Sequence, residues 1–167
     1  MNDQNILVMG AGNLMRRDDG IGPFVIDQLR NEPLPSNVIL KDAGTDGLSM
    51  IDAISEFNQI VVIDAVDLNQ RPGDIRIFTP AELKSVNGAD SLSTHGFSLA
   101  DLFELMRLLG YRAGIKIIGV QPEDIGYGNG FSEALGARVS ELMEIIKNTL
   151  QNLQPALPPH RPSFKPK

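Results

Sequence analysis

The chain of 167 residues contains no cysteine and only two histidines, His95 and His160. The absence of cysteine excludes a disulfide framework, a cysteine-based zinc finger, an iron–sulfur cluster and a cysteine nucleophile. It also makes a reducing cytoplasm the default compartment. With two histidines in the chain, the imidazole available to any metal or acid–base site is restricted to these two positions.

Long hydrophobic runs and an excess of positive charge are lacking as well. No stretch reaches the roughly 18 apolar residues that cross a membrane, and the N-terminal segment has neither the basic flank nor the cleavage site of a secretory signal. The net charge of −6 argues against a nucleic-acid partner, because the phosphate backbone attracts positive surfaces. We therefore expect a cytoplasmic protein that binds neither nucleic acid nor membrane.

What the sequence does contain is an alternation of short apolar runs with segments of helical period. The pattern predicts strands at 6–9, 37–41, 60–63, 75–78 and 115–120, and helices at 20–30, 48–55, 99–110 and 132–153, with a short helix starting at 79–82. Strands and helices that alternate with short connections favour a parallel sheet. We predict an α/β fold, a three-layer sandwich whose mostly parallel twisted sheet has about five strands and helices on both faces.

The proline content divides the chain into two parts. Five prolines fall within 155–167, where no apolar period is found. We predict a single α/β domain over 1–153 and a proline-rich flexible tail over 154–167. His160 falls in this tail, so it is interpreted as a solvated residue.

Candidate chemistry gathers where the predicted strands end, since ligands of such sheets bind outside the carboxyl ends of the strands. Asp18 and Asp19 follow the first strand, Asp64 ends the third, and His95 lies in the polar loop before the helix at 99–110. A carboxylate in an apolar strand is costly unless it is paired, hydrogen-bonded or bound to metal. Two carboxylates and one imidazole would form an open site for a divalent ion such as zinc or nickel.

Two other site types fit less well. Gly10 and Gly12 follow a strand as in a dinucleotide-binding loop, but Met15 replaces the third glycine and two acids stand where pyrophosphate would bind. Ser98 and Ser132 lie in partial nucleophile-elbow patterns, but both precede helical stripes and are better interpreted as N-caps. One of Asp18 and Asp19 is expected only to complement the positive end of the following helix.

The ordered motifs resemble those of the hydrogenase maturation endopeptidases. The resemblance runs from about Ile6 to Leu150 and rests on five pieces in register: Gly10-x-Gly12-Asn13 with Asp18-Asp19-Gly20-x-Gly22-Pro23, Asp42-x-Gly44-Thr45, Ile63-Asp64-Ala65, His95-Gly96, and Gly119-Val120-Gln121-Pro122.

The resemblance implies an endopeptidase that removes the C-terminal extension of a nickel–iron hydrogenase large-subunit precursor after nickel insertion. Carried over by motif, the nickel contacts are Asp19, Asp64 and His95, which are then both the catalytic and the metal residues. The family's acid stands directly before the glycine that opens the helix, which selects Asp19 over Asp18; some members have glutamate there. The segment 42–47 is implied to position substrate backbone.

The same resemblance implies a nickel ion that is carried by the substrate, with zinc or cadmium able to replace it in the purified protein. The expected partner is the nickel-loaded precursor, and a monomer is expected. The metal could polarise the scissile carbonyl or lower the pKa of a bound water, or it could serve only as a recognition mark while a carboxylate activates water; these alternatives stay open. Two other functions also remain: a non-catalytic nickel-binding maturation chaperone and, with less support, a nucleotide-binding module.

Overall fold

The computed structural model describes residues 5–45, 47–82 and 99–153. They form a five-stranded sheet in the order β2-β1-β3-β5-β4. The strands are β1 (Ile6–Ala11), β2 (Val38–Gly44), β3 (Gln59–Ala65), β4 (Ile75–Phe78) and β5 (Gly114–Val120). Neighbouring strands are parallel except at the edge, where β4 runs antiparallel to β5. The predicted α/β fold with a mostly parallel sheet is confirmed.

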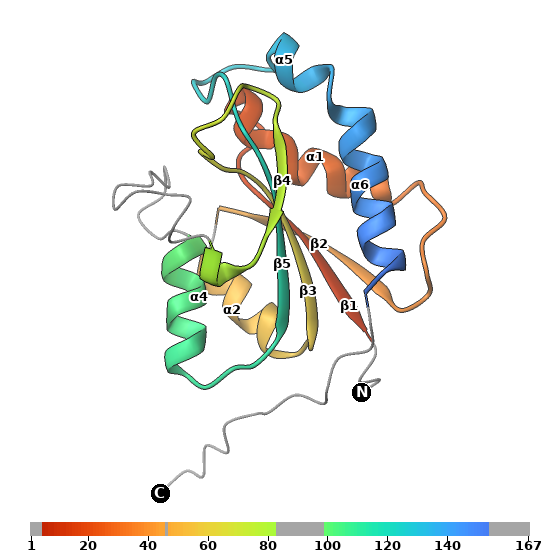
Figure 1. Cartoon of the computed structure of the whole chain (residues 1–167), viewed down its shortest axis with the longest axis vertical. Coiled ribbons are helices and arrows are strands. Elements are labelled where there is room, and N and C mark those ends of the chain that lie inside the picture. Colours follow the sequence, from red (N-terminus) through yellow and green to blue (C-terminus); the bar gives the residue numbers. More distant parts are fainter. Residues whose placement is uncertain (1–4, 46, 83–98, 154–167) are drawn as a thin grey trace, which may run out of the picture.

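Helices cover both faces of this sheet (Figure 1). One face carries α1 (Ile21–Leu29) and α6 (Val139–Gln151), and the other carries α2 (Gly47–Ser55) and α4 (Leu99–Leu108). A 3-10 helix, η1 (Arg17–Gly20), leads into α1, and the short α5 (Glu133–Gly136) precedes α6. Within the described ranges, no helix combines the length and the apolar character that a membrane crossing requires.

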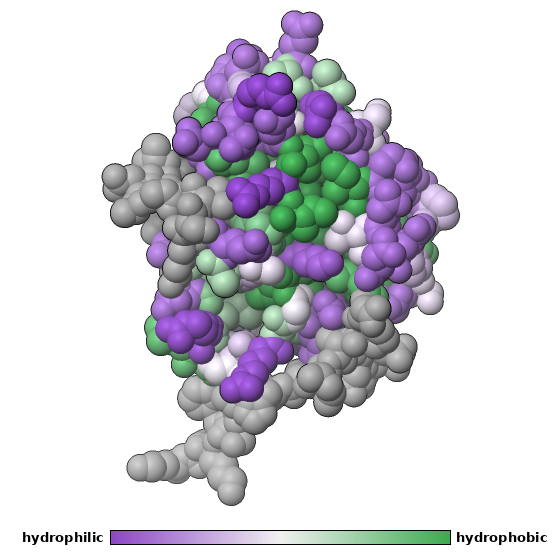
Figure 2. Space-filling model, viewed as in Figure 1, coloured by the Kyte–Doolittle hydropathy of each residue, from purple (hydrophilic) through white to green (hydrophobic). Residues whose placement is uncertain are grey.

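Each face of the sheet has its own hydrophobic core. Side chains alternate across a strand, so a continuous apolar run feeds both cores at once. In β1, Leu7 and Met9 pack with α2 and α4, while Ile6 and Val8 pack with α1 and α6. The second core reaches the surface between β4 and α6, where Figure 2 shows a gathering of apolar side chains. Ile75 on the edge strand β4 is one partly buried residue of this core.

The last predicted helix differs from the structure. The apolar period predicts one helix over 132–153, but the chain forms α5 and α6 with a turn at 137–138 between them. The N–H of Arg138 donates to the carbonyl of Leu135, three residues back, and this tight turn separates the helices. The periodicity continues through the turn, which is why it does not reveal the interruption.

The capping predictions can be followed at three positions. Ser132 is the N-cap of α5, since its side chain accepts a hydrogen bond from the N–H of Leu135, as expected. Gly110 follows α4 with a φ of 82°, the left-handed conformation that glycine adopts at the C-terminal end of a helix. Ser98 lies outside the described residues, as do His95, His160 and the predicted tail at 154–167.

Two glycines bring α1 against the sheet. A Cβ on Gly10 would overlap the carbonyl of Gly22, and a Cβ on Gly22 would overlap the backbone of Ala11 and approach the carbonyl oxygen of Ile63 to 2.7 Å. Backbone therefore packs on backbone where β1, β3 and the first turn of α1 meet. This contact places the η1–α1 junction, and with it the acidic residues, directly at the carboxyl edge of the sheet.

Candidate active site

Asp64 lies near the carboxyl end of β3, beside Gly119 of β5. The residue is partly buried at the end of a strand whose four preceding residues are fully buried. Burial raises the pKa of the Asp64 carboxyl well above its usual range, and the negative charge of Asp19 raises it further. A hydrogen bond that the Asp64 carboxylate accepts from the Ala65 backbone lowers this pKa but does not offset the other two effects.

Asp19 lies in η1, and its side chain is oriented by the loop that follows β1. The backbone N–H of Asn13 donates to Oδ2 of Asp19 over 3.0 Å. Gly12 adopts a φ of 125°, and a Cβ there would overlap the carbonyl oxygen of Asp19. The structure thus brings two of the three predicted residues, Asp19 and Asp64, close enough for their charges to interact.

The third predicted residue, His95, lies outside the described residues, so its role stays a prediction. In the part of the chain that the structure describes, no group of three or more histidine, cysteine, aspartate or glutamate residues gathers as a metal site. A metal ion bound by Asp19 and Asp64 would need its third ligand of this kind from elsewhere, and the sequence predicts His95 for that place.

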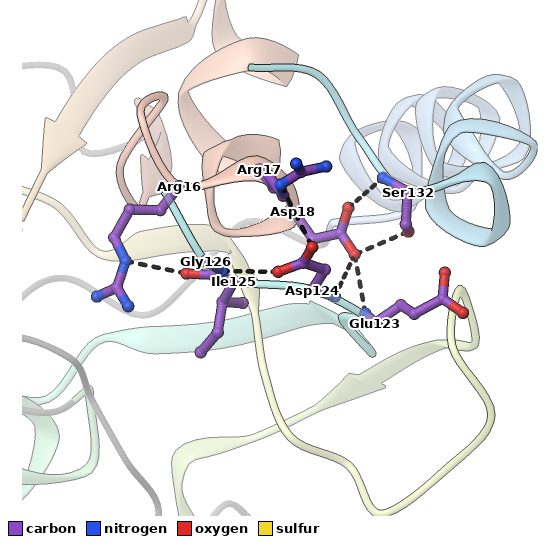
Figure 3. A network of polar contacts seen from close by, with 8 residues as sticks. All are labelled: Arg16, Arg17, Asp18, Glu123, Asp124, Ile125, Gly126 and Ser132. Atoms are coloured by element: carbon purple, nitrogen blue, oxygen red, sulfur yellow. Dashed lines mark hydrogen bonds and ion pairs between the residues drawn. The ribbon is translucent and has the colours of Figure 1, made fainter. Parts of the chain in front are cut away.

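Asp18 makes different contacts from the adjacent Asp19. Its side chain is completely buried and accepts four hydrogen bonds from the segment that follows β5, as Figure 3 shows. The backbone N–H groups of Glu123 and Asp124 donate over 2.8 and 3.1 Å. The N–H and the hydroxyl of Ser132 donate over 2.7 and 2.8 Å. Burial alone would raise the pKa of the Asp18 carboxyl, but these hydrogen bonds outweigh it and hold the pKa below the usual value.

The interpretation of one acid as a helix-end charge needs correction at Asp18. No side chain caps either η1 or α1 by a hydrogen bond, and the four hydrogen bonds that the Asp18 carboxylate accepts come from a loop more than 100 positions away. The prediction that one of the two acids is structural agrees with these contacts, but the partner is the β5–α5 connection. We call this connection, residues 121–132, the β5–α5 loop.

Backbone contacts join the β5–α5 loop to residues 15–17 along a short parallel bridge. The N–H of Gly128 donates to the carbonyl of Met15 over 3.0 Å, and its carbonyl accepts from the N–H of Arg17 over 3.2 Å. The Arg16 side chain donates to the carbonyl of Ile125, and Arg17 forms an ion pair with Asp124 (Figure 3). Two loops that are distant in the sequence are thereby held as one unit beside Asp19.

Gln121 fixes the segment that follows Asp64. Its buried side-chain oxygen accepts hydrogen bonds from the N–H groups of Leu68 and Gln70, over 2.7 and 3.2 Å. Its amide nitrogen donates to Asp67 over 3.3 Å. In the sequence Gln121 is notable only as part of a motif. The feature that could have indicated its structural role is its place as a polar residue directly after the buried end of β5.

The chemistry available at this edge is that of closely spaced carboxylates. Two negative charges, one of them on a partly buried side chain, repel each other, and a bound divalent cation relieves that repulsion. Ser132 donates to Asp18 and accepts from Leu135, so its hydroxyl is engaged in structure and is not arranged as a nucleophile. Asp42 accepts a hydrogen bond from the N–H of Gly44 at the end of β2, a local turn contact.

Comparison with known proteins finds a protein family whose sequences match this chain. A family model described as hydrogenase maturation protease (HycI) matches residues 24–149. The hydrogenase expression/formation protein HupD of Thiocapsa roseopersicina is 32% identical over 146 residues, covering 86% of this chain and 66% of HupD. The chain thus spans about two thirds of the length of that relative.

Solved structures of similar fold carry related descriptions. The hydrogenase maturating endopeptidase HybD from E. coli superposes with a TM-score of 0.77 at 25% identity, covering 93% of this chain and 98% of HybD. The [NiFe] hydrogenase maturation protease HycI from Thermococcus kodakarensis gives a TM-score of 0.70 at 28% identity, covering 89% of this chain and 94% of HycI.

Proposed function

The chain belongs to the hydrogenase maturation protease family, and from this premise we propose that it is an endopeptidase acting on the large-subunit precursor of a nickel–iron hydrogenase. It removes the C-terminal extension of that precursor after nickel has been inserted. Nickel enters as part of the substrate, and Asp19, Asp64 and His95 contact it. The reaction takes place in the cytoplasm, and the enzyme works as a monomer.

One observation carries this proposal: a desolvated carboxylate, Asp64, is held within range of the charge of Asp19 at the edge where ligands of such sheets bind. Without a cation the arrangement disfavours the ionised form of Asp64. A divalent ion presented by the substrate would compensate both charges. Carboxylate and imidazole ligands suit nickel, and also zinc or cadmium in a purified preparation.

Recognition of the metal and cleavage of the peptide are linked by position. A precursor that brings its bound nickel to Asp19 and Asp64 also brings the neighbouring peptide to this edge of the sheet. A water molecule beside the carboxylates then attacks the scissile carbonyl. Free precursor without nickel lacks the cation that makes the carboxylate pair favourable, so it is not cut.

The test is incubation of the purified chain with nickel-loaded and nickel-free precursor, followed by mass measurement of the large subunit. We expect a loss of mass at the C-terminus only for the nickel-loaded form. An unchanged mass together with retained nickel binding would instead support the chaperone function. Binding of NAD or ATP, seen as a shift in melting temperature, would support the nucleotide-binding module.

Variants separate the residues of the proposed site. Asp19→Asn, Asp64→Asn and His95→Ala are each expected to lower the processing rate by more than about 100-fold, since loss even of a residue supporting a metal ligand costs 10–100-fold. Asp27→Asn, on the exposed side of α1, is the matched control and keeps the full rate. Processing at the normal rate by Asp64→Asn would show that the assignment is wrong.

A further inference from the structure

Large apolar side chains are exposed on the two joined loops beside the proposed site. Leu14 is 55% exposed, Met15 63% and Tyr127 81%. They are three of the six large hydrophobic residues that the described part of the chain exposes, and the other three lie on β2, β4 and α4. Single exposed apolar residues are ordinary, but a cluster marks an interaction site. We call Leu14, Met15 and Tyr127 the apolar platform.

The loops that carry this platform are held in place by many contacts. The bridge between Arg16 and Gly128 places Met15 next to the segment that contains Tyr127. The guanidinium of Arg16 lies over the Tyr127 ring, 5.2 Å from its centroid, while the same side chain donates to the carbonyl of Ile125. Asp18 anchors the other end of the β5–α5 loop through Ser132 (Figure 3).

Loops whose backbone is held in this way are suited to binding. Ordering side chains on association costs roughly 0.5–1.5 kcal/mol for each flexible one, and a surface that is already ordered avoids part of that cost. Tyrosine, methionine and arginine are also enriched in protein interfaces. Tyr127, Met15 and Arg16 supply all three types in one place.

The platform also adjoins the proposed site directly. Leu14 packs on Gly20, where an added Cβ would lie 2.9 Å from the Leu14 Cα and 3.4 Å from its Cδ2. Gly20 is the residue that follows Asp19, and Asn13, which precedes Leu14, donates to the Asp19 carboxylate. A protein–protein interface covers about 800 Å² on each partner, a patch roughly 30 Å across. A protein that delivers a metal ion to Asp19 therefore covers Leu14 as well.

We propose that the apolar platform of Leu14, Met15 and Tyr127 is the docking surface for the folded body of the hydrogenase large-subunit precursor. This inference rests on the proposed function. The precursor contributes an apolar patch next to its nickel-bearing segment, and the platform binds that patch while Asp19 and Asp64 face the metal. Docking here selects a whole protein and aligns its extension with the site.

The experiment measures steady-state processing of nickel-loaded precursor by Met15→Ser, Tyr127→Ser and the double variant. We expect the KM for precursor to rise at least 10-fold in the double variant with kcat nearly unchanged, because the platform does not touch the reacting atoms. Leu108→Ser is the matched control: Leu108 is 68% exposed but lies at the end of α4, six residues before β5 begins at the opposite edge. Its KM should equal that of the unaltered chain.

Direct binding separates this inference from the proposed function. Precursor is immobilised, and the affinity of each platform variant is measured in an Asp64→Asn background, which prevents cleavage. Weaker binding by the platform variants supports the docking surface even if no cleavage occurs. An unchanged KM and affinity overturn the docking surface while the protease function stands. A platform variant that alters only the self-association of the chain overturns it too, since a second copy would then be the occupant.

Discussion

Ser132 donates two hydrogen bonds to Asp18, one from its backbone N–H to Oδ1 over 2.7 Å and one from its hydroxyl to Oδ2 over 2.8 Å. The same hydroxyl accepts from the N–H of Leu135 and caps α5. A single serine thus connects the start of α5 with the turn that carries Asp19. This pair ties the conformation of the proposed site to a segment 114 positions away.

Asp18→Asn is expected to destabilise the fold, because the amide carries no charge and turns two donor hydrogens toward the N–H groups that now donate to the carboxylate. Oδ2 accepts three of the four hydrogen bonds and Oδ1 accepts one, so an amide nitrogen in either place faces at least one N–H group. Losing that charge-assisted hydrogen bond costs about 1.5 kcal/mol or more. Urea denaturation should show a lower midpoint. Asp27→Asn, in an exposed ion pair with Arg30, serves as control and should change stability by less than about 0.5 kcal/mol.

Asp64→Asn is expected to have the opposite effect on stability. The pKa of the Asp64 carboxyl is raised by burial and by Asp19, so ionisation is less favourable in the folded chain than in the unfolded one. The stability that this group contributes is fully present below its unfolded pKa of about 3.9 and is lost as the pH rises through its folded pKa. In metal-free buffer the asparagine variant should therefore be more stable at neutral pH, with the difference vanishing in acid.

Thermal unfolding of both proteins over about pH 4 to 8 checks this sign. The gain in stability should accompany loss of precursor processing, the combination expected where a site carries charges that the fold alone disfavours. A variant that is less stable than the unaltered chain at neutral pH would contradict the expectation.

Gly22→Ala is expected to lower the free energy of unfolding by about 2 kcal/mol or more. Its Cβ would overlap the backbone of Ala11, which cannot move without disturbing the centre of the sheet. Gly136→Ala is the control: a Cβ added there meets no atom within 4 Å, and alanine favours the helical conformation of α5. Melting temperatures of the two variants should move in opposite directions.

Gln121→Leu is expected to loosen the connection after β3 and cost about 1–3 kcal/mol, since buried N–H groups lose their acceptor. Hydrogen exchange at the Leu68 amide, whose partner is the Gln121 oxygen, should accelerate. The amide of Val8, in the centre of the sheet, provides the internal reference and should exchange at a rate set only by global unfolding. Equal acceleration at both amides would contradict a local role for Gln121.

The strands β1 and β3 can be predicted because burial on both faces leaves a continuous apolar run in the sequence. Residues 60–63 show this signature, and each of them is completely buried in β3. Family resemblance, supported by motif order, indicates the proposed site residues, and the structure places Asp19 and Asp64 close enough for their charges to interact. Ser132 can be identified as an N-cap because a cap acts locally, on an N–H three residues later.

The partners of Asp18 cannot be predicted, because no local pattern records a contact across more than 100 positions. The family motif distinguishes Asp19 from Asp18, but it does not say what Asp18 contacts. Tertiary packing places Asp18 in hydrogen bonds with the β5–α5 loop, while the charge of Asp19 acts on Asp64. The break between α5 and α6 escapes prediction for a related reason. Apolar residues keep their helical spacing through the turn at 137–138. The pattern therefore indicates which face of the segment 132–153 is buried, but it does not indicate whether that segment is one continuous helix.

The contact between Gly10 and Gly22 fixes how closely the start of α1, and with it Asp19 in η1, can approach the sheet. Backbone already touches backbone there, so the helix can neither approach the sheet further nor be adjusted by repacking side chains. The reach of a carboxylate at position 19 is then set by the length of its side chain and by the hydrogen bond that it accepts from the Asn13 N–H. Replacing Asp19 by glutamate would move the carboxylate oxygens outward by the length of one methylene group while the backbone stays in place. The distance between the two carboxylates of the proposed site would then change without a change of fold.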